Sequence, residues 1–497
     1  MPDRTVRAEP ATGPAAVVLM PLPEVRGRAP MDVAEAFRDL PGLVLLESAR
    51  PGRTGRWSFL SADPVAVLEA PADGPDPLAD ARRLLRRLDA GAAPAVPSGT
   101  DDRPRGAPAA PPFLGGLAGY LSYDLGRRLE RIPELAAADQ DLPLLRLALH
   151  DWVVAWDRSS GAAWLGGRAV DGDSGRLHDR LDGVRRRLAS VRRRGDAADS
   201  ASVVRASATS APTAFVPGLS KPAWIERVGA IRTAIADGEI YQANLTRRLA
   251  APFDGDPWPL FRRLRTGDPA LFAAFLDLGP DPDTRAPRAL LSASPEPFLS
   301  ATPHGRVATD PIKGTRPRGR TRADDRALAR ELLASAKDQA ENVMIVDVLR
   351  NDLGRVCEPG SVRVPRLCRL ERTAAVQHLV TTVTGQLRAG LDPLHLLAAS
   401  FPGGSITGAP KIRAIQLIET LEPVRRGPYT GALGWVGPDG AMGTSIIIRT
   451  FVADGARLSL HVGGGITWRS DPEAEWDETV AKARGPLGAI GAREVEA

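Results

Sequence analysis

The chain has very few cysteines for its length. Its 497 residues include only Cys357 and Cys368. Two cysteines are too few for a disulfide framework and too isolated to form a zinc site by themselves, so a reducing compartment is expected. Neither cysteine lies in the glycine-flanked turn that exposes a nucleophilic residue, and we therefore expect no glutaminase activity within this chain.

Long apolar runs and a surplus of one charge are also missing. No uninterrupted apolar stretch reaches the roughly 18 residues that a membrane-spanning helix needs, and the N-terminus lacks a basic region followed by an apolar one. We therefore predict a cytoplasmic protein without membrane contact. The 65 basic and 60 acidic residues nearly balance, which gives no indication of nucleic-acid binding. A hydrophobic content of 43% allows one very large core or two to three ordinary ones.

Lysine is scarce, because arginine supplies almost all of the 65 basic residues. Only the lysine ammonium loses its proton readily and becomes a nucleophile, so the retained lysines are candidates for chemistry. Lys313 is the best candidate, whereas chance retention on a solvated face is an equal alternative for Lys221 and Lys337. The five lysines are Lys221, Lys313, Lys337, Lys411 and Lys482.

Two stretches of biased composition divide the chain. Residues 91–112 are rich in Pro, Ala and Gly and predict a flexible insertion, and residues 191–215 are rich in Ser and Ala and predict a linker. The expected organisation is a disordered N-terminus at 1–14, an N-terminal region at 15–190, a linker at 191–218 and a catalytic domain at 219–490.

The periodicity predicts a mixed fold. Helices are expected over 224–245, 322–350 and 473–490, and strands over many short apolar runs, among them 43–48, 65–70, 444–454 and 456–468. Strands and helices do not alternate as they do in a parallel sheet. The fold class is therefore predicted to be α+β.

Carboxylates at helical spacing suggest a metal site. In the last predicted helix Glu475, Glu478 and Lys482 stand at i, i+3 and i+7 and so share one face. Glu341 follows Lys337 at i+4 in an earlier helix. Carboxylates from two helices suit Mg²⁺, although ordinary i,i+4 pairing is the simpler explanation of the spacing alone.

Glycine-rich turns complement these carboxylates. They occur at 311–315, 401–411 and 462–466, and their free N–H groups can hold carboxylates. Arg449, expected within a strand, could add a bidentate clamp. Together with the acidic residues, these turns favour a ligand with two carboxylates and a bound metal.

Several motifs in order resemble the chorismate-utilising enzymes. They are SPEPF, TDPIKGTRPRG, KDQAENVMIVDVLRNDLGRV, AVQHLV, FPGGSITGAPK, TSIIIRT, GGGI and EAEWDETVAKAR. The resemblance is dense over 222–487 and looser over 40–126. It implies a large layered α+β fold like that of anthranilate synthase component I, with antiparallel sheets, packed helices and two intertwined subdomains.

The resemblance also implies a reaction. The family includes anthranilate, aminodeoxychorismate, isochorismate and salicylate synthases, which start from chorismate with Mg²⁺. Lys313 stands where anthranilate synthases have alanine and where the aminating branch has the lysine that attacks C2 of chorismate, which implies the product 4-amino-4-deoxychorismate. Gln242 stands where isochorismate synthases have a water-activating lysine, which argues against that activity.

Two alternatives stay open, an anthranilate synthase component and a non-catalytic chorismate-binding regulatory subunit. Because the chain has no glutaminase region, the ammonia is expected from a separate glutamine amidotransferase subunit in a heterodimer.

Individual site residues follow from the same resemblance. Glu296 is the implied general acid and base, and His378 is the histidine above the substrate ring, with a satisfied core histidine as the alternative. Glu341 and Glu478 are the implied Mg²⁺ ligands, with Glu475 nearby. The implied substrate contacts are Gly314, Thr315, Thr407, Tyr429, Arg449, Gly463, Gly465 and Lys482, of which Tyr429 could equally be a core aromatic residue.

Glu47 and Ser48 resemble the tryptophan pocket of the family. In anthranilate synthases that pocket gives feedback inhibition, whereas in the aminating relatives the bound tryptophan is structural or the pocket is empty. The sequence does not choose between these cases.

Overall fold

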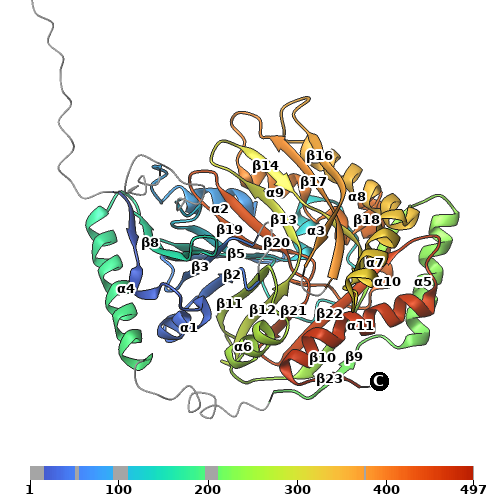
Figure 1. Cartoon of the computed structure of the whole chain (residues 1–497), viewed down its shortest axis with the longest axis horizontal. Coiled ribbons are helices and arrows are strands. Elements are labelled where there is room, and N and C mark those ends of the chain that lie inside the picture. The colour runs from blue at the N-terminus through green and yellow to red at the C-terminus, as the bar shows by residue number, and fades with distance from the viewer. Residues whose placement is uncertain (1–15, 51–54, 93–109, 196–210, 374–375, 496–497) are drawn as a thin grey trace, which may run out of the picture.

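Two β-sheets that pack face to face form the centre of the protein (Figure 1). The structure is a computed structural model and describes residues 16–50, 55–92, 110–195, 211–373 and 376–495. The predicted N-terminal segment 1–14 and most of the predicted insertion 91–112 and linker 191–218 lie outside these residues. Within the described residues, no helix is long and apolar enough to cross a bilayer.

The larger sheet combines strands from the start, middle and end of the chain. Its order is β1 (Val17–Pro21), β8 (Ala162–Arg168), β7 (Trp152–Asp157), β3 (Trp57–Ser61), β2 (Val44–Glu47), β11 (Phe272–Pro280), β12 (Pro287–Ser294), β21 (Thr450–Asp454), β22 (Arg457–Ile466), β10 (Gln242–Pro252), β9 (Ala214–Pro217) and β23 (Arg493–Glu494), with β18 (Gly408–Ala409) also paired to β10.

The second sheet is built in the same way. Its order is β15 (Ile312–Pro317), β17 (Val376–Gln386), β14 (Arg306–Thr309), β13 (Pro297–Ala301), β20 (Met442–Ile446), β19 (Ala432–Val436), β5 (Gly116–Leu121), β6 (Leu145–His150) and β4 (Ala66–Ala70), with β16 (Arg363–Arg372) also paired to β17.

Every described strand pair of the two sheets is antiparallel except the short pair β9 and β23. The predicted α+β class, with antiparallel sheets, helices and intertwined halves, is confirmed.

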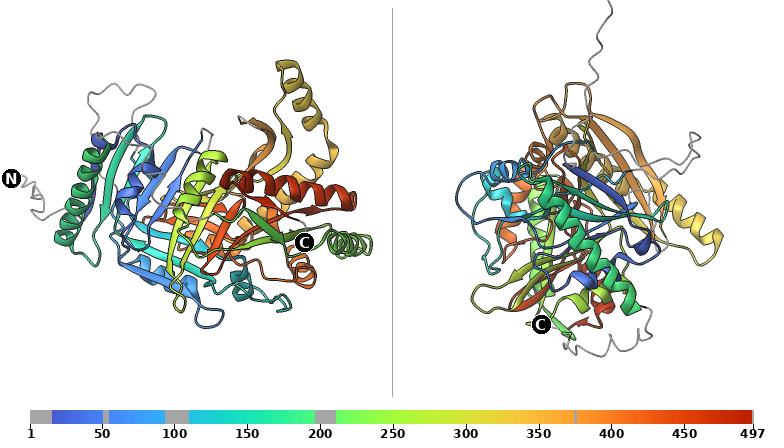
Figure 2. Two further views of the ribbon diagram at one scale, coloured as in Figure 1. Left: turned by 90° about the horizontal axis from the view of Figure 1, so that it is seen from below. Right: turned by 90° about the vertical axis from the view of Figure 1, so that its left-hand side faces the viewer.

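Helices cover the outer faces of both sheets (Figures 1 and 2). One apolar cluster packs α4, α6 and α11 against the larger sheet, and another packs α2, α8 and α9 against the second sheet. The described α-helices are α1 (Pro30–Ala34), α2 (Pro77–Leu85), α3 (Gly126–Leu129), α4 (Ser174–Gly195), α5 (Lys221–Ala236), α6 (Trp258–Gly267), α7 (Arg322–Ala334), α8 (Ala336–Gly354), α9 (Pro393–Ser400), α10 (Lys411–Leu421) and α11 (Pro472–Ile490).

A third apolar cluster lies between the sheets. Phe113 stacks on Trp435 at 4.8 Å between ring centroids, and Phe59 meets the same indole edge-on at 5.7 Å. Phe59 belongs to the larger sheet and Trp435 to the second. Burial of such large rings at the interface fixes how the two sheets lie against each other.

Two predicted helices have different bounds in the structure. The helix expected over 224–245 ends at Ala236, because Gly238 takes a left-handed φ of 76° and the strand β10 begins at Gln242. The helix expected over 322–350 is two helices. Ser335 ends α7 and caps α8, since its hydroxyl accepts a hydrogen bond from the backbone N–H of Asp338 at 3.3 Å.

The strand expected over 444–454 is also two strands. β20 ends at Ile446 in the second sheet and β21 begins at Thr450 in the larger sheet. Arg449, which we expected within a strand, lies in the crossing with a positive φ of 49°. A uniform apolar run cannot reveal such a crossing, because both strands are buried and of similar composition.

Candidate active site

The candidate site lies where the chain crosses between the two sheets. One crossing, between β12 and β13, carries Glu296, and the other, between β20 and β21, carries Arg449. The crossings are joined by backbone hydrogen bonds from Ile446 N to Glu296 O at 3.1 Å and from Ala293 N to Arg449 O at 3.0 Å. Two residues far apart in sequence are thereby held at one junction.

Lys313 and Glu296 form an electrostatically coupled pair at this junction. Burial lowers the pKa of the Lys313 ammonium, and the nearby Glu296 carboxylate acts in the opposite direction. Burial likewise raises the pKa of Glu296, against the influence of Lys313. The site therefore makes a free amine and a protonated carboxyl group accessible, which are the forms that a nucleophile and a general acid need.

Ser405 contacts both members of this pair. Its backbone carbonyl accepts a hydrogen bond from Lys313 Nζ at 3.3 Å. Its side chain hydrogen-bonds to Glu296 and lowers the pKa of that carboxyl group, although less than burial raises it. Sequence reasoning missed Ser405, whose turn we had treated only as a source of backbone N–H groups.

His378 lies beside Thr315 on adjacent strands. The two residues pair in register between β15 and β17, with the Thr315 hydroxyl 3.0 Å from His378 Nδ1. Burial lowers the pKa of His378 to about 4, helped by the positive charges of Arg50 and Arg449. The imidazole is therefore neutral at neutral pH and is not an acid there.

Arg50 is a second residue that the sequence did not single out. Its positive charge helps to lower the pKa of His378, and burial together with the charge of Arg449 lowers the pKa of Arg50 itself. Its Nε is buried without a hydrogen-bond partner among the described residues, and the Arg449 side chain is exposed. Neighbouring guanidinium groups repel each other, so this part of the site favours an anionic ligand.

The three predicted metal ligands gather on α8 and α11. Burial raises the pKa values of Glu341 and Glu475, and the charge of Glu475 raises that of Glu341 further. Burial also acts to raise the pKa of Glu478, but the charge and hydrogen bond of Lys482 together with the charges of Lys337 and Lys313 outweigh it, so the net shift is downward. Glu478 forms an ion pair with Lys482, in which Lys482 Nζ lies 2.7 Å from Glu478 Oε1.

The hydrogen-bond and ion-pair partners of Glu341 indicate whether these carboxylates could bind a cation. Glu341 Oε1 is buried without a hydrogen bond among the described residues, and it lies 3.9 Å from Lys337 Nζ. A buried acceptor beside further carboxylates fits a hard cation such as Mg²⁺. Within the same described residues, however, no three acidic, histidine or cysteine side chains are close enough to form a ready-made metal cluster.

The glycine-rich strand β22 runs directly past these groups. Lys482 Nζ donates a hydrogen bond to Gly463 O at 2.7 Å. A Cβ atom on Gly464 would lie 3.3 Å from Glu475 Oε2 and 3.7 Å from both Glu478 Oε1 and Lys482 Nζ. A Cβ on Gly465 would lie only 2.4 Å from Gln242 Nε2. Glycine here keeps the carboxylates and amides close to the backbone.

Gly314 has a similar role on β15. Its φ is 77°, and a Cβ there would lie 3.0 Å from both Asp338 Cβ and Leu332 Cδ1. The left-handed backbone and the close approach of α8 both require glycine between Lys313 and Thr315. This predicted substrate contact therefore also shapes the strand that carries Lys313.

Thr407 and Tyr429 are buried in the wall of the site. The Thr407 hydroxyl donates to Gly403 O at 3.0 Å, and its carbonyl accepts from Asn244 N at 2.8 Å. Tyr429 stacks on His461 with ring centroids 4.9 Å apart, and burial raises the pKa of its hydroxyl. Their contacts in the structure are internal, and their contact with substrate stays a prediction.

Glu47 and Ser48 line a separate cavity of about 340 Å³ between the sheets. The cavity is also lined by Pro297 and Phe298, which directly follow Glu296. Glu47 already forms a bidentate ion pair with Arg265, with one N–O distance of 3.0 Å, and Ser48 Oγ donates to Trp57 O at 2.8 Å. The Glu47 carboxylate of the predicted tryptophan pocket thus has a partner within the protein.

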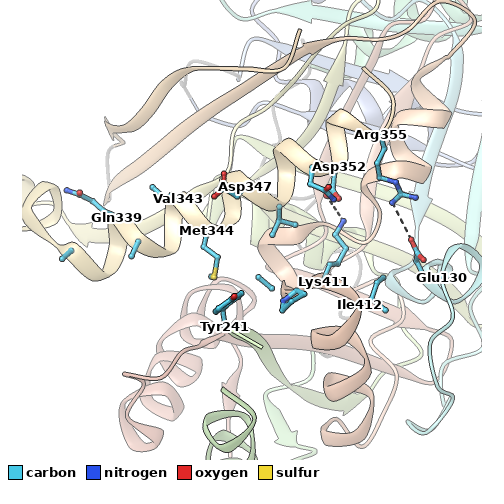
Figure 3. A pocket seen from close by; sticks show the side chains of 16 residues that line it. Glu130, Tyr241, Gln339, Val343, Met344, Asp347, Asp352, Arg355, Lys411 and Ile412 are labelled. Carbon is cyan, nitrogen blue, oxygen red and sulfur yellow. Dashed lines mark hydrogen bonds and ion pairs between the residues drawn. The ribbon is translucent and has the colours of Figure 1, made fainter. Parts of the chain in front are cut away.

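A larger cavity of about 930 Å³ opens on the surface between α8 and the start of α10 (Figure 3). Tyr241 and Met344 face it, and Lys411 at one end donates a hydrogen bond to Asp352 Oδ2 at 2.7 Å. Tyr241 is 72% exposed and Val343 42% exposed. Exposed aromatic and aliphatic side chains around a cavity are typical of a protein interface.

Comparisons with known proteins give matches over most of the chain. The family model described as chorismate binding enzyme matches residues 44–488. Aminodeoxychorismate synthase component 1 of Salmonella typhimurium is 41% identical over 371 residues, 75% of this chain and 76% of the relative. Anthranilate synthase component 1 of Streptomyces coelicolor is 39% identical over 462 residues, 91% of this chain and 84% of the relative.

Solved structures share the fold. Anthranilate synthase component I of Streptococcus pneumoniae superposes with a TM-score of 0.69 at 24% identity, over 97% of this chain and 95% of that one. The menaquinone-specific isochorismate synthase of Escherichia coli gives a TM-score of 0.67 at 18% identity, over 98% and 96%. At these identities the likeness concerns the fold alone.

Proposed function

The chain belongs to the chorismate binding enzymes, and on that premise we propose that it aminates chorismate to 4-amino-4-deoxychorismate, as an aminodeoxychorismate synthase component 1. The observation that carries the proposal is the coupled pair of Lys313 and Glu296, whose burial favours a free amine beside a carboxylic acid. The product would be a precursor of 4-aminobenzoate, for folate or for specialised metabolites, made in the cytoplasm.

The proposed chemistry uses both groups of the pair. The Lys313 amine forms a bond to C2 of chorismate while the ring double bonds shift and the C4 hydroxyl leaves as water, with a proton from the Glu296 carboxyl group. Ammonia then forms a bond to C4, the double bonds shift back and the C2–N bond to Lys313 breaks. The Glu296 carboxylate takes a proton from the new C4 ammonium group, which restores the acid.

The other charged groups would bind the two carboxylates of the substrate. Arg449 and Arg50 lack carboxylate partners at hydrogen-bond distance among the described residues. The predicted substrate contact Gly465 lies on β22, where it pairs with Asn244 of β10. Glu341, Glu475 and Glu478 would hold Mg²⁺. When bound, the ion would supply positive charge that neutralises and orients a substrate carboxylate.

The ammonia would come from a separate glutamine amidotransferase subunit. The relatives are named component 1, which implies a second component. We place its docking at the cavity between α8 and α10, because Tyr241 and Val343 expose apolar surface there. Tyr241 directly precedes Gln242, and its backbone N–H donates to Ala409 O at 2.7 Å, so the cavity wall is continuous with the wall of the site.

Two alternatives are separated from this proposal by the reaction product. An anthranilate synthase would release anthranilate, and the relative from Streptomyces coelicolor matches more of this chain than the aminodeoxychorismate relative does. A non-catalytic chorismate-binding subunit would give no product. Tryptophan binding at Glu47 and Ser48 would add regulation or stability to any of the three.

The decisive experiment is product identification without the partner. The purified chain is incubated with chorismate, Mg²⁺ and an ammonium salt at mildly alkaline pH, and the products are identified by mass and fluorescence. We expect 4-amino-4-deoxychorismate, which a lyase converts to 4-aminobenzoate. Anthranilate, isochorismate or an absence of turnover by a well-folded sample would contradict the proposal.

A further inference from the structure

A chain of hydrogen bonds leads from Lys313 into the core. The carbonyl of Ser405 accepts hydrogen bonds from Lys313 Nζ at 3.3 Å and from Asn244 Nδ2 at 3.1 Å. Asn244 Oδ1 in turn accepts a hydrogen bond from Gln242 Nε2 at 3.1 Å. Gln242 and Asn244 are buried, so these bonds are shielded from competing water.

The donor and acceptor of each hydrogen bond in this series follow from the bond at the Ser405 carbonyl. A backbone carbonyl can only accept, so Asn244 must turn its Nδ2 group toward Ser405. Its Oδ1 then faces Gln242, which must present Nε2. Gln242 is left with Oε1 as a buried acceptor that has no hydrogen-bond partner among the described residues. One carbonyl thus orients two side-chain amides.

The backbone around Asn244 holds the amide in place. Its N–H donates to Thr407 O at 2.8 Å, and the residue pairs with Gly465 across β10 and β22. A Cβ on Gly465 would lie 3.1 Å from Asn244 Oδ1 and 2.4 Å from Gln242 Nε2. The glycine therefore leaves the space that the two amides occupy.

Building on the proposed amination, we propose that Asn244 is a positioning residue for the Lys313 nucleophile. It fixes the Ser405 turn, whose carbonyl holds the lysine amine and whose side chain hydrogen-bonds to Glu296. Removal of the amide would free this turn and displace both reacting groups at once, with no loss of a direct contact to the substrate. A displacement of about 1 Å in such a group can lower a rate by about 100-fold.

The test measures formation of the covalent adduct on Lys313. The native chain, Asn244→Ala and Asn244→Asp are mixed with excess chorismate and Mg²⁺ without ammonia, and the adduct is followed by intact mass over a range of pH. For Asn244→Ala we expect the maximal rate to fall about 100-fold, with half-saturation by chorismate within about threefold of the native value. For Asn244→Asp we expect the acid-side midpoint of adduct formation to move to higher pH, since a new carboxylate raises the pKa of a nearby ammonium.

Thr246→Val serves as the matched control. Thr246 lies two residues further along β10, and its hydroxyl donates to Glu422 Oε1 at 2.9 Å, outside the chain of bonds to Lys313. This variant should lower the melting temperature and leave adduct formation unchanged.

A native rate in Asn244→Ala and an unmoved pH midpoint in Asn244→Asp would overturn the positioning role alone. If the native chain forms no adduct on Lys313, the proposed function and the positioning role both fall.

Discussion

Glu296 and Arg449 lie on neighbouring segments that pass from one β-sheet to the other, where Glu296 O accepts a hydrogen bond from Ile446 N and Arg449 O accepts one from Ala293 N. The backbone hydrogen bonds that join their segments measure 3.0 and 3.1 Å. An acid and a cation are thereby anchored to two sheets whose contact is fixed by buried aromatic rings. Such anchoring to strands positions functional groups more firmly than a surface loop does.

Replacement of the lysine nucleophile should abolish the proposed reaction. In Lys313→Ala we expect formation of 4-amino-4-deoxychorismate to fall by at least about 100-fold, because the amine that forms the C2 bond is missing. Release of anthranilate by this variant would show how narrowly the two family reactions differ. The control is Lys221→Ala, since Lys221 lies on the surface in an ion pair with Glu473. A Lys313→Ala variant that aminates C4 at the native rate would refute the covalent route.

The pH dependence of adduct formation should have two limbs. The Lys313 amine must be free, so the rate rises with pH through its lowered pKa, and the Glu296 carboxyl group must be protonated, so the rate falls as pH passes its raised pKa. Glu296→Gln should remove the falling limb. It should also shift the rising limb to lower pH, because the carboxylate that raises the pKa of Lys313 is gone. Rates measured by intact mass without ammonia avoid the titration of ammonia itself.

Protonation of His378 should lower the stability of the folded protein at acidic pH. Its pKa is lowered to about 4 from the ordinary 6.5, so the unfolded chain binds the proton more readily than the folded one. The free energy of unfolding should therefore fall as pH decreases from about 6.5 to about 4. His378→Gln should show a shallower decrease than the native chain in urea unfolding followed by tryptophan fluorescence. Parallel curves for the two proteins would mean that His378 is not held neutral.

Magnesium binding should release protons. Glu341 and Glu475 have raised pKa values, so a cation that requires ionised carboxylates displaces the protons they hold. Calorimetry of Mg²⁺ binding in buffers of different ionisation enthalpy measures this release without any turnover. Glu341→Gln should weaken binding and reduce the proton count. Glu473→Gln, on an exposed position of α11, should change neither, and equal affinity in both variants would exclude Glu341 as a ligand.

A change at the cavity between α8 and α10, the proposed docking site of the glutaminase subunit, should lower the reaction rate only when glutamine is the nitrogen source. Val343→Lys places a charge on the exposed apolar rim of the cavity in Figure 3. With a glutamine amidotransferase subunit from the same organism, we expect the glutamine-dependent rate to fall at least about tenfold and the ammonia-dependent rate to stay unchanged. Leu367→Lys, at another exposed apolar position on β16, is the control. Equal loss of both rates would indicate damage to the site and not to an interface.

The sequence by itself determined the family and the fold class, and it singled out the candidate site residues whose roles stay predictions. The ordered motifs around Lys313, Glu296 and Glu341 are sufficient to identify the family, because each motif has a particular side chain at a particular place in the chain. The spacing of Glu475, Glu478 and Lys482 also fixed their common helix face, since helical periodicity is a local property.

Tertiary structure alone decided how these segments meet. The crossings that carry Glu296 and Arg449, and the link from Lys313 through Ser405 to Asn244, join residues distant in the chain. The pKa shifts of Lys313 and Glu296 depend on burial and on each other's charge, which no spacing reveals. Local patterns report which elements form, whereas proximity and desolvation arise only when two sheets pack together.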